Sequence, residues 1–333
     1  MPGEHQQEVS PPAPDGGSAP QRLLVRVDGL QRRHAVLAFP VGVVRKFGDD
    51  RAGQLAALVA YYAFFSLFPL LLAVTTIVAY VAGNKTAQEL QDSALAQIPV
   101  IGTQIAGQVN TLSGSGIALV IGVLLALWAG LGCILAAQDA MSDVWNVPRA
   151  RQAKFVAKVV RSLGVLAVVG FALVLGSTAT QAVSWLPESA GVARAAGILG
   201  SCLINVGLIL VAFQVLNPQR HPWRELLPGA VVAGVGYTLL QLVGRWYVDR
   251  TIKGATDTYG TFAVVIGLLS WLYLVGQLLL VAAEINVVTA RRLWPRSLLP
   301  EAITDADHRA LAGEATEEQL VADEQIDVEF PRT

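Results

Sequence analysis

Residues 262–290 read FAVVIGLLSWLYLVGQLLLVAAEINVVTA and hold a single charged side chain, that of Glu284. A helical stretch of this length can cross a hydrocarbon core that is roughly 30 Å thick. Within lipid, a helix satisfies its backbone hydrogen bonds internally, which an isolated strand cannot do. The stretch therefore predicts a transmembrane helix with one ionisable group inside it.

Five further apolar runs precede this one, and none of them contains an acidic or basic residue. They occupy residues 52–81, 117–137, 163–186, 195–216 and 226–244. Each has about the 20 residues that a membrane crossing requires. The expected fold class is all-α: a polytopic membrane protein with six transmembrane helices, in a membrane domain over residues 52–296.

The composition of the whole chain agrees with this interpretation. Of the 333 residues, 53% are hydrophobic and 15% are charged, and the mean hydropathy is +0.52. Soluble domains usually carry about 25% charged residues. The chain has too few polar groups to cover a water-facing surface, so a soluble globular protein is excluded.

The segments that flank the apolar runs have different compositions. Residues 1–20 are rich in Pro, Gly and Ser, and we expect them to be disordered. Residues 21–51 intersperse seven basic residues with Leu, Val and Phe, a pattern typical of an amphipathic helix in the lipid headgroup layer. This interspersion disfavours a nucleic-acid-binding arm. Residues 297–333 form an acidic segment that we expect to be a disordered tail.

The distribution of basic residues predicts the orientation. If the N-terminus is cytoplasmic, 17 Lys and Arg residues lie on the cytoplasmic side and 5 on the opposite side. Membrane proteins place an excess of Lys and Arg in the cytoplasm. We therefore expect a multi-pass protein of the bacterial inner membrane with both termini in the cytoplasm and with membrane lipids as partners.

Polar side chains inside the last run are the first candidates for a functional site. Ser270, Gln277 and Glu284 stand seven residues apart, which keeps them on one stripe of a helix. A carboxylate inside a membrane is costly, so it needs a reason to be there. Glu284 has two open interpretations: an ion pair with an arginine that locks this helix to a neighbour, or a proton- or substrate-linked role.

The first apolar run offers a second group of candidates. Tyr62, Ser66 and Pro69 share one helical face, with Tyr61 beside them. Pro69 removes a backbone donor, which predicts a kink. Transporters often place binding sites at such interruptions, although a packing kink explains the same residues. Asn205 is an isolated amide inside the fourth run, for which a hydrogen bond between helices is the default explanation.

Motifs of catalysis and cofactor binding are missing from the sequence. No His, Cys, Asp and Glu cluster has metal-ligand spacing, and no P-loop, dinucleotide fingerprint or nucleophile elbow occurs. We therefore expect no cofactor, no metal and no enzymatic activity.

Four segments carry a family resemblance: LAALVAYYAFFSLFPLLL at 55–72, VWNVPRARQAKF at 144–155, NPQRHPWRELLPGAVVAG at 217–234 and YGTFAVVIGLLSWLYLVGQLLLVAAEINVV at 259–288. They resemble the YihY/BrkB family of bacterial inner-membrane proteins, formerly mislabelled ribonuclease BN. The residues that match the family pattern are Tyr61, Tyr62, Ser66, Pro69, Trp145, Pro148, Trp223, Pro228, Gly229, Tyr259, Gly260, Trp271, Tyr273, Glu284 and Asn286. Where the family usually has Asn before Trp145, this chain has Ser142 and Asp143.

The resemblance implies a six-helix inner-membrane protein associated with the cell envelope, with resistance to host killing and with transport. Together with the polar residues in the apolar runs, it favours a transporter or flippase-like protein for a small amphiphilic or envelope-related substrate. The alternative is a non-transporting scaffold or regulator of envelope integrity. Ribonuclease activity and a nucleic-acid partner are disfavoured, because RNA cleavage normally needs metal-bound carboxylates or a pair of histidines in a basic cleft. The longest expected cytoplasmic stretch between runs, at about 138–162, has five basic residues but only Asp139 and Asp143 as acids. A homo-oligomer is left open.

Overall fold

The computed structural model describes residues 19–82, 116–165, 191–247, 261–299, 303–321 and 323–330. Within these ranges the chain is helical and contains no strand. The main helices are α1 (Ala19–Arg33), α2 (Ala35–Asp49), α3 (Ala52–Ala82), α6 (Gly116–Val144), α8 (Gly191–Leu216), α9 (Trp223–Tyr247), α11 (Thr261–Arg291) and α12 (Asp305–Glu317). A short 3₁₀ turn, η1 (Arg149–Arg151), and a helical stretch at 155–165 follow α6.

Five of the six apolar runs lie wholly inside helices, namely α3, α6, α8, α9 and α11. Most of the third run, at 166–186, lies outside the described residues. Among the residues that the structure describes, two segments are long and apolar enough to cross a membrane, Leu199–Leu216 and Val265–Arg291. The all-helical class is thus confirmed for the described chain, whereas six crossings stay a prediction.

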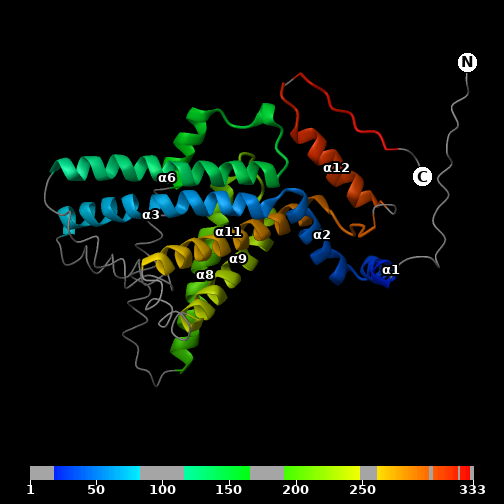
Figure 1. Ribbon diagram of the computed structural model, residues 1–333, viewed down its shortest axis with the longest axis horizontal. Helices are drawn as coiled ribbons and strands as arrows, with labels where there is room; N and C mark the ends of the chain where they lie inside the picture. The colour runs from blue at the N-terminus through cyan, green and yellow to red at the C-terminus, as the bar shows by residue number, and fades with distance from the viewer. Residues whose placement is uncertain are drawn as a thin grey trace, which may run out of the picture.

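The helices pack as two pairs around a central member. α3 lies along α6, α8 lies along α9, and α11 contacts both α3 and α9 (Figure 1). The helix that carries Glu284 therefore lies between the two pairs and packs against both. Small residues on α11 allow this central position. Ala282 and Ala283 are 0% and 1% exposed, and their small side chains let the backbones of neighbouring helices approach closely.

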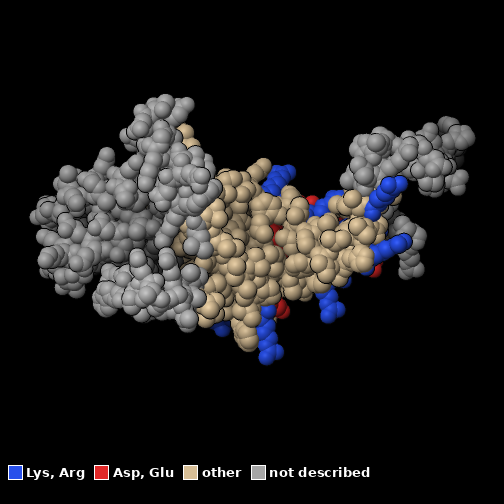
Figure 2. Space-filling view, turned by 90° about the horizontal axis from the view of Figure 1, so that it is seen from below, with Lys and Arg blue, Asp and Glu red and all other residues tan. Residues whose placement is uncertain are grey.

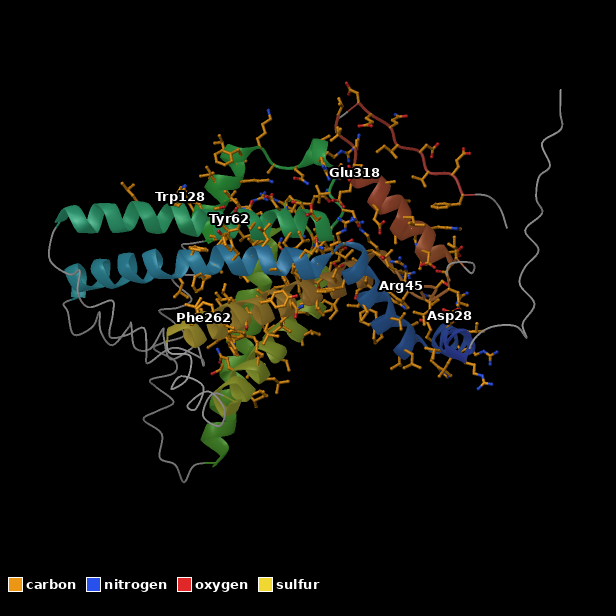
Figure 3. All side chains as sticks on the ribbon, in the orientation of Figure 1. Asp28, Arg45, Tyr62, Trp128, Phe262 and Glu318 are labelled. Carbon is orange, nitrogen blue, oxygen red and sulfur yellow. The ribbon has the colours of Figure 1, made fainter. Side chains whose placement is uncertain are left out.

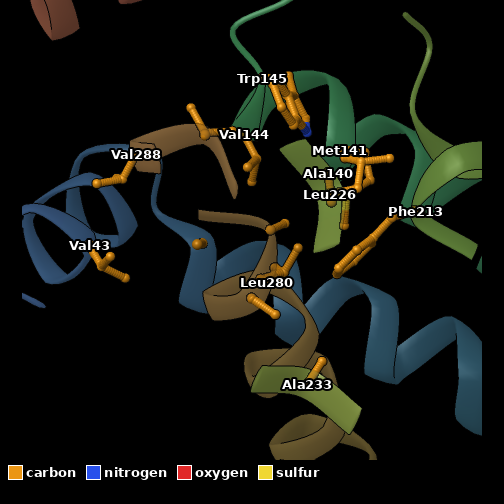
Figure 4. Packing of buried hydrophobic residues seen from close by; sticks show 14 of the residues in the cluster. Val43, Ala140, Met141, Val144, Trp145, Phe213, Leu226, Ala233, Leu280 and Val288 are labelled. Carbon is orange, nitrogen blue, oxygen red and sulfur yellow. The ribbon is translucent and has the colours of Figure 1, made fainter. Parts of the chain in front are cut away.

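The apolar core lies where these helices converge. Figure 4 shows Val43 of α2, Val144 and Trp145 at the end of α6, and Leu280 of α11 directed into this cluster. By contrast, many large apolar side chains elsewhere face outward, among them Trp128 at 78% and Leu203 at 71% exposure. Outward-facing apolar residues on long helices are expected where lipid is the solvent.

Three helix ends near the core use left-handed backbone. Arg51, Asn146 and Arg292 have φ values of 51°, 44° and 53°. A residue in this conformation ends a helix and redirects the chain. As a result the α2–α3 corner and the ends of α6 and α11 all turn close to one another.

The terminal segments differ in part from the sequence-based expectations. Residues 1–18 of the expected disordered segment lie outside the described residues. The basic segment 21–51 is not one helix: it divides between α1 and α2 at His34. On the face of the molecule in Figure 2, Lys and Arg side chains are spread over the described part, from its middle to the end that carries α1 and α2. Their position in a headgroup layer stays a prediction.

The expectation of a disordered acidic tail is wrong for residues 305–317, which form α12. The reason is an N-terminal capping motif, which the net charge of the segment does not indicate. Thr304 and Asp307 make a reciprocal capping box at the N-terminus of α12. The helix then packs at the same end of the molecule as α1 and α2 (Figure 1).

Candidate functional site

A group of three buried ionisable side chains occupies the junction of α2, α3 and α11. Lys46 comes from the last turn of α2, Asp50 from the α2–α3 corner and Glu284 from α11. The side chains of Lys46 and Glu284 are both 0% exposed, and that of Asp50 is 3% exposed. We refer to Lys46, Asp50 and Glu284 as the buried triad.

Lys46 is buried because it continues the inward face of α2. Ala38, Gly42 and Val43 on that face are also buried, and a Cβ on Gly42 would lie 2.8 Å from the carbonyl oxygen of Leu293. Lys46 Nζ donates hydrogen bonds to the Asp50 carboxylate and to the carbonyl oxygen of Val144, the latter at 3.2 Å. The ammonium therefore ties α2 to the end of α6.

Glu284 is the member of the triad with the fewest partners. Its Oε2 lies 3.9 Å from Lys46 Nζ, which is an ion-pair distance but too long for a hydrogen bond. Neither carboxylate oxygen accepts a hydrogen bond from a donor group among the described residues, and the Asp50 carboxyl group lies next to Glu284. One of the two open interpretations paired Glu284 with an arginine near the interface, and that choice of partner is wrong for the described residues, where Lys46 of the N-terminal segment is the cation at ion-pair distance.

The triad has an excess of acid. One ammonium faces two carboxyl groups, so the fully ionised group would carry a net negative charge inside the protein. Burial raises the pKa of Asp50, and the neighbouring Lys46 ammonium opposes that effect. A buried site with two carboxyl groups and one cation can take up a proton or a second cation.

Asn286 lies on the same helix as Glu284 and has a structural contact. Its Oδ1 accepts a hydrogen bond of 2.6 Å from the backbone N–H of Gly229 in α9. The Asn286 side chain is buried, and its Nδ2 has no partner among the described residues. Asn286 therefore holds α11 against α9 where Gly229 lets the two helices touch.

The other candidates on α11 do not join the triad. Ser270 is exposed, and Gln277 donates a hydrogen bond of 2.8 Å to the Tyr273 hydroxyl on its own helix. The stripe of Ser270, Gln277 and Glu284 thus runs from surface to interior. Asn205 donates a bond of 3.3 Å to Thr238 Oγ1 of α9, which confirms the expected link between helices.

The candidates on α3 also lie apart from Glu284. Tyr61 and Tyr62 are 53% and 39% exposed, and their rings meet edge to face. Ser66 is buried and donates to the carbonyl oxygen of Ala63, one turn earlier. The side chain of Pro69 lies outside the described residues, so the kink stays a prediction.

Sequence reasoning did not single out Lys46 and Asp50, although a signal for them was present. Ala38, Gly42 and Lys46 recur every four residues, so a lysine continues a small-residue face, and Asp50 stands four residues further on. A lysine at such a position is directed at the core and requires an acidic partner. Both residues lie just outside the first apolar run, which begins at residue 52.

A second polar layer joins α12 to the bundle. Arg296 donates from Nε to Asp307 at 2.6 Å and from Nη2 to Asp49 at 2.8 Å. At the other end of α12, Glu317 accepts from Asn146 Nδ2 at 3.0 Å, and Asn146 Oδ1 accepts from Arg291 at 3.2 Å. Among the residues that the structure describes, no group of three His, Cys, Asp or Glu side chains could hold a metal ion.

Comparison with known proteins identifies the family. The family model described as "Virulence factor BrkB" matches residues 43–302, which include the whole buried triad. The chain belongs to the BrkB family. It is therefore a membrane protein of this family, in agreement with the apolar helices α8 and α11.

Several curated members of this group are similar over most of the chain. The UPF0761 membrane protein Smlt0865 of Stenotrophomonas maltophilia is 26% identical over 76% of this chain and 61% of its own length. The inner membrane protein YhjD of Escherichia coli is 22% identical over 76% of this chain and 81% of its own. YfkH of Bacillus subtilis, whose printed name is "Putative ribonuclease-like protein YfkH", is 26% identical over 74% of this chain and 91% of its own length. No solved structure matches the chain.

Proposed function

We propose that this BrkB-family member is a bacterial inner-membrane transporter or flippase-like protein for a small amphiphilic or envelope-related substrate. The observation that carries the proposal is Glu284, a carboxyl group in the central helix that accepts no hydrogen bond from a donor group among the described residues. Ionisable groups within membrane helices commonly mark ion, proton or substrate paths.

The energetics of the buried triad support a role beyond packing. Removing charged groups from water costs several kcal/mol per ion, and apolar replacements of buried ion pairs are often neutral or stabilising. If the triad had only a structural role, we would also expect equal numbers of positive and negative groups in it. Here Lys46 bonds to Asp50, and Glu284 is left at 3.9 Å from the same ammonium. That excess carboxyl group is the place for a coupled proton or a substrate cation.

The topology that we propose places both termini in the cytoplasm, with α1, α2 and α12 on the cytoplasmic side. Gln31 of α1 donates to the carbonyl oxygen of Arg296, and Arg296 contacts Asp49 of α2 and Asp307 of α12. These contacts support one shared side for the two terminal segments. Reporter fusions at both ends test this, and activity of the two reporters in different compartments contradicts it.

The alternative function is a non-transporting scaffold or regulator of envelope integrity. The contacts of α12 support this second candidate. Through Asp307 and Glu317, α12 is bound to Arg296 after α11 and to Asn146 after α6, so the C-terminal segment is held against the membrane domain. In that case Glu284 only stabilises the bundle. No enzymatic step belongs to either proposal, so labelled RNA incubated with the purified protein should remain intact.

A reconstituted translocation assay distinguishes the two candidates. The full-length protein is placed in liposomes that contain a headgroup-labelled fluorescent phospholipid, and an impermeant reductant measures how fast the probe changes leaflet. We expect Glu284→Gln to retain a normal melting temperature and to lose translocation at least tenfold. Glu329→Gln, at an exposed position, is the control.

The reverse result decides for the scaffold. If the wild-type protein does not increase translocation over empty liposomes, or if Glu284→Gln translocates at the wild-type rate, the transport proposal fails. A normal rate combined with a lowered melting temperature would assign Glu284 to stability alone.

A further inference from the structure

A pocket of about 260 Å³ lies outside the buried triad, between α2, the chain after α11, and α12. Arg45 and Asp49 of α2 form one wall, and Arg296 and Ser297 form the second. The remaining lining residues are Leu299, Ile303, Asp307, Leu311 and Glu314. Most small-molecule pockets are larger, at about 300–1,000 Å³. The space suits a compact polar group rather than a large ligand.

Two guanidinium groups of the pocket have unused capacity. Arg45 makes no hydrogen bond or ion pair within the described part of the chain, and Figure 3 shows it on α2. Arg296 is 4% exposed and is bound by Asp49 and Asp307, but its Nη1 has no partner among the described residues. An anionic oxygen bound at Arg45 would therefore displace no bond within the described part of the protein.

The same pocket has an excess of carboxylates. Asp49, Asp307 and Glu314 face two arginines, and Arg296 is already shared between Asp49 and Asp307. Burial raises the pKa of Glu314, and the carboxylates of Asp49 and Asp50 raise it further. A cation beside Glu314 would relieve this repulsion. The pocket thus favours a ligand that carries both charges.

The surroundings of the pocket point to lipid as the source of that ligand. Ile303 and Leu311 line it and are 52% and 42% exposed. On α2, Val44 next to Arg45 is 71% exposed, and Val36 two turns earlier is 83% exposed. Exposed apolar residues beside an arginine are typical of a surface that sits in the lipid interface.

We propose that this pocket binds the headgroup of a zwitterionic phospholipid of the phosphoethanolamine type. The phosphate binds Arg45, the primary ammonium binds Glu314 and Asp49, and the glycerol end contacts Ile303 and Leu311. The site is separate from the buried triad and does not depend on transport. A primary ammonium donates hydrogen bonds to carboxylates, which a quaternary ammonium cannot do, so phosphatidylcholine should bind more weakly.

Native mass spectrometry of the full-length protein in detergent tests the proposal. Phosphatidylethanolamine, phosphatidylcholine and phosphatidylglycerol with identical acyl chains are titrated separately. We expect phosphatidylethanolamine to bind about tenfold more tightly than the other two, and Arg45→Gln and Glu314→Gln each to weaken it about tenfold. Arg33→Gln, an exposed arginine of α1, is the matched control and should bind as the wild type does.

Free phosphoethanolamine then separates the headgroup from the lipid. Competition only at concentrations far above that of the lipid supports a membrane ligand. Competition at equal concentrations shows that the soluble headgroup suffices and overturns the assignment to lipid. Equal binding of the three lipids, or an equal loss in Arg33→Gln and Arg45→Gln, shows general lipid adhesion and overturns the site. A melting temperature for each variant confirms that the fold is intact.

Discussion

Lys46 Nζ and Glu284 Oε2 lie 3.9 Å apart, joining the last turn of α2 to the C-terminal third of the central helix α11. Both side chains are fully buried. The short helix that precedes the membrane domain is thus coupled to its centre by charge as well as by packing. Any change at Lys46 is transmitted directly to two carboxyl groups.

Replacing that lysine should destabilise the protein strongly. Lys46→Met keeps most of the volume but leaves Asp50 and Glu284 buried without a cation, which costs about 3–5 kcal/mol. We expect a clearly lower melting temperature in detergent. Adding Asp50→Asn and Glu284→Gln to Lys46→Met removes the stranded charges and should recover most of the loss.

Lys154→Met, at an exposed position, controls for the loss of a positive charge. If Lys46→Met alone melts like the wild type, the triad is not an electrostatic unit, and the interpretation of Glu284 as its excess carboxyl group loses its basis.

The crossing of α9 and α11 should tolerate no side chain at Gly229. A Cβ there would lie 2.0 Å from the carbonyl oxygen of Ala282 and 2.6 Å from Asn286 Oδ1. Gly229→Ala must separate the helices and break the Asn286 bond, with an expected cost of about 3 kcal/mol.

Gly207→Ala is the control, because no atom lies within 4 Å of its added Cβ. There we expect unchanged stability or a gain of up to about 1 kcal/mol. Equal melting temperatures for the two variants would contradict the close crossing.

The sequence predicted helices well and terminal structure poorly. Apolar runs such as 262–290 specify helix through length and hydropathy alone, and α11 matches that run to within one residue at each end. The tail was misjudged because its average charge suggests disorder. Its structure depends on Asp307, which caps α12 and binds Arg296 at the same time. Contacts between residues distant in sequence are invisible to composition.

Glu284 could be found from the sequence, but its partner could not. A lone carboxyl group in an apolar run is conspicuous, whereas an arginine or a lysine on any neighbouring helix could face it. Arg291 was close enough along α11, yet it bonds to the carbonyl oxygen of Trp145 at 2.5 Å. The choice of Lys46 depends on how α2 packs on α11.

The docking of α12 should depend on Asp307 more than on its neighbours. Asp307→Ala removes the capping box and one of the two carboxylates bound by Arg296, and together these should weaken docking by about 2–3 kcal/mol. Hydrogen exchange of the α12 backbone measures this. Asp305→Ala alters the same first turn at an exposed position and should lose at most about 1 kcal/mol. Equal exchange in both variants would show that α12 is held by other contacts.

Asp143 should make the protein less stable as the pH rises. Burial raises its pKa to about 6, with the carboxylates of Glu317 and Asp139 adding to the effect. The folded protein therefore holds this proton more tightly than the unfolded chain, in which the pKa of the side chain is near its ordinary value of 3.8. Unfolding free energy falls as the pH rises between these two values and stays constant above them.

Asp143→Asn removes the titrating group, so the variant should be more stable than the wild type above pH 6 and equal to it near pH 4. The gain is on the order of 1 kcal/mol, because solvent screens a half-buried group. Melting temperatures across this pH range provide the measurement, with Asp327→Asn at an exposed position as the control. Because Glu317 belongs to α12, deleting α12 should shrink the difference between Asp143→Asn and the wild type. If Asp143→Asn raised the unfolding free energy by the same amount at every pH, the effect would come from packing. Charge repulsion between Asp143 and Glu317 of α12 would then not contribute to it.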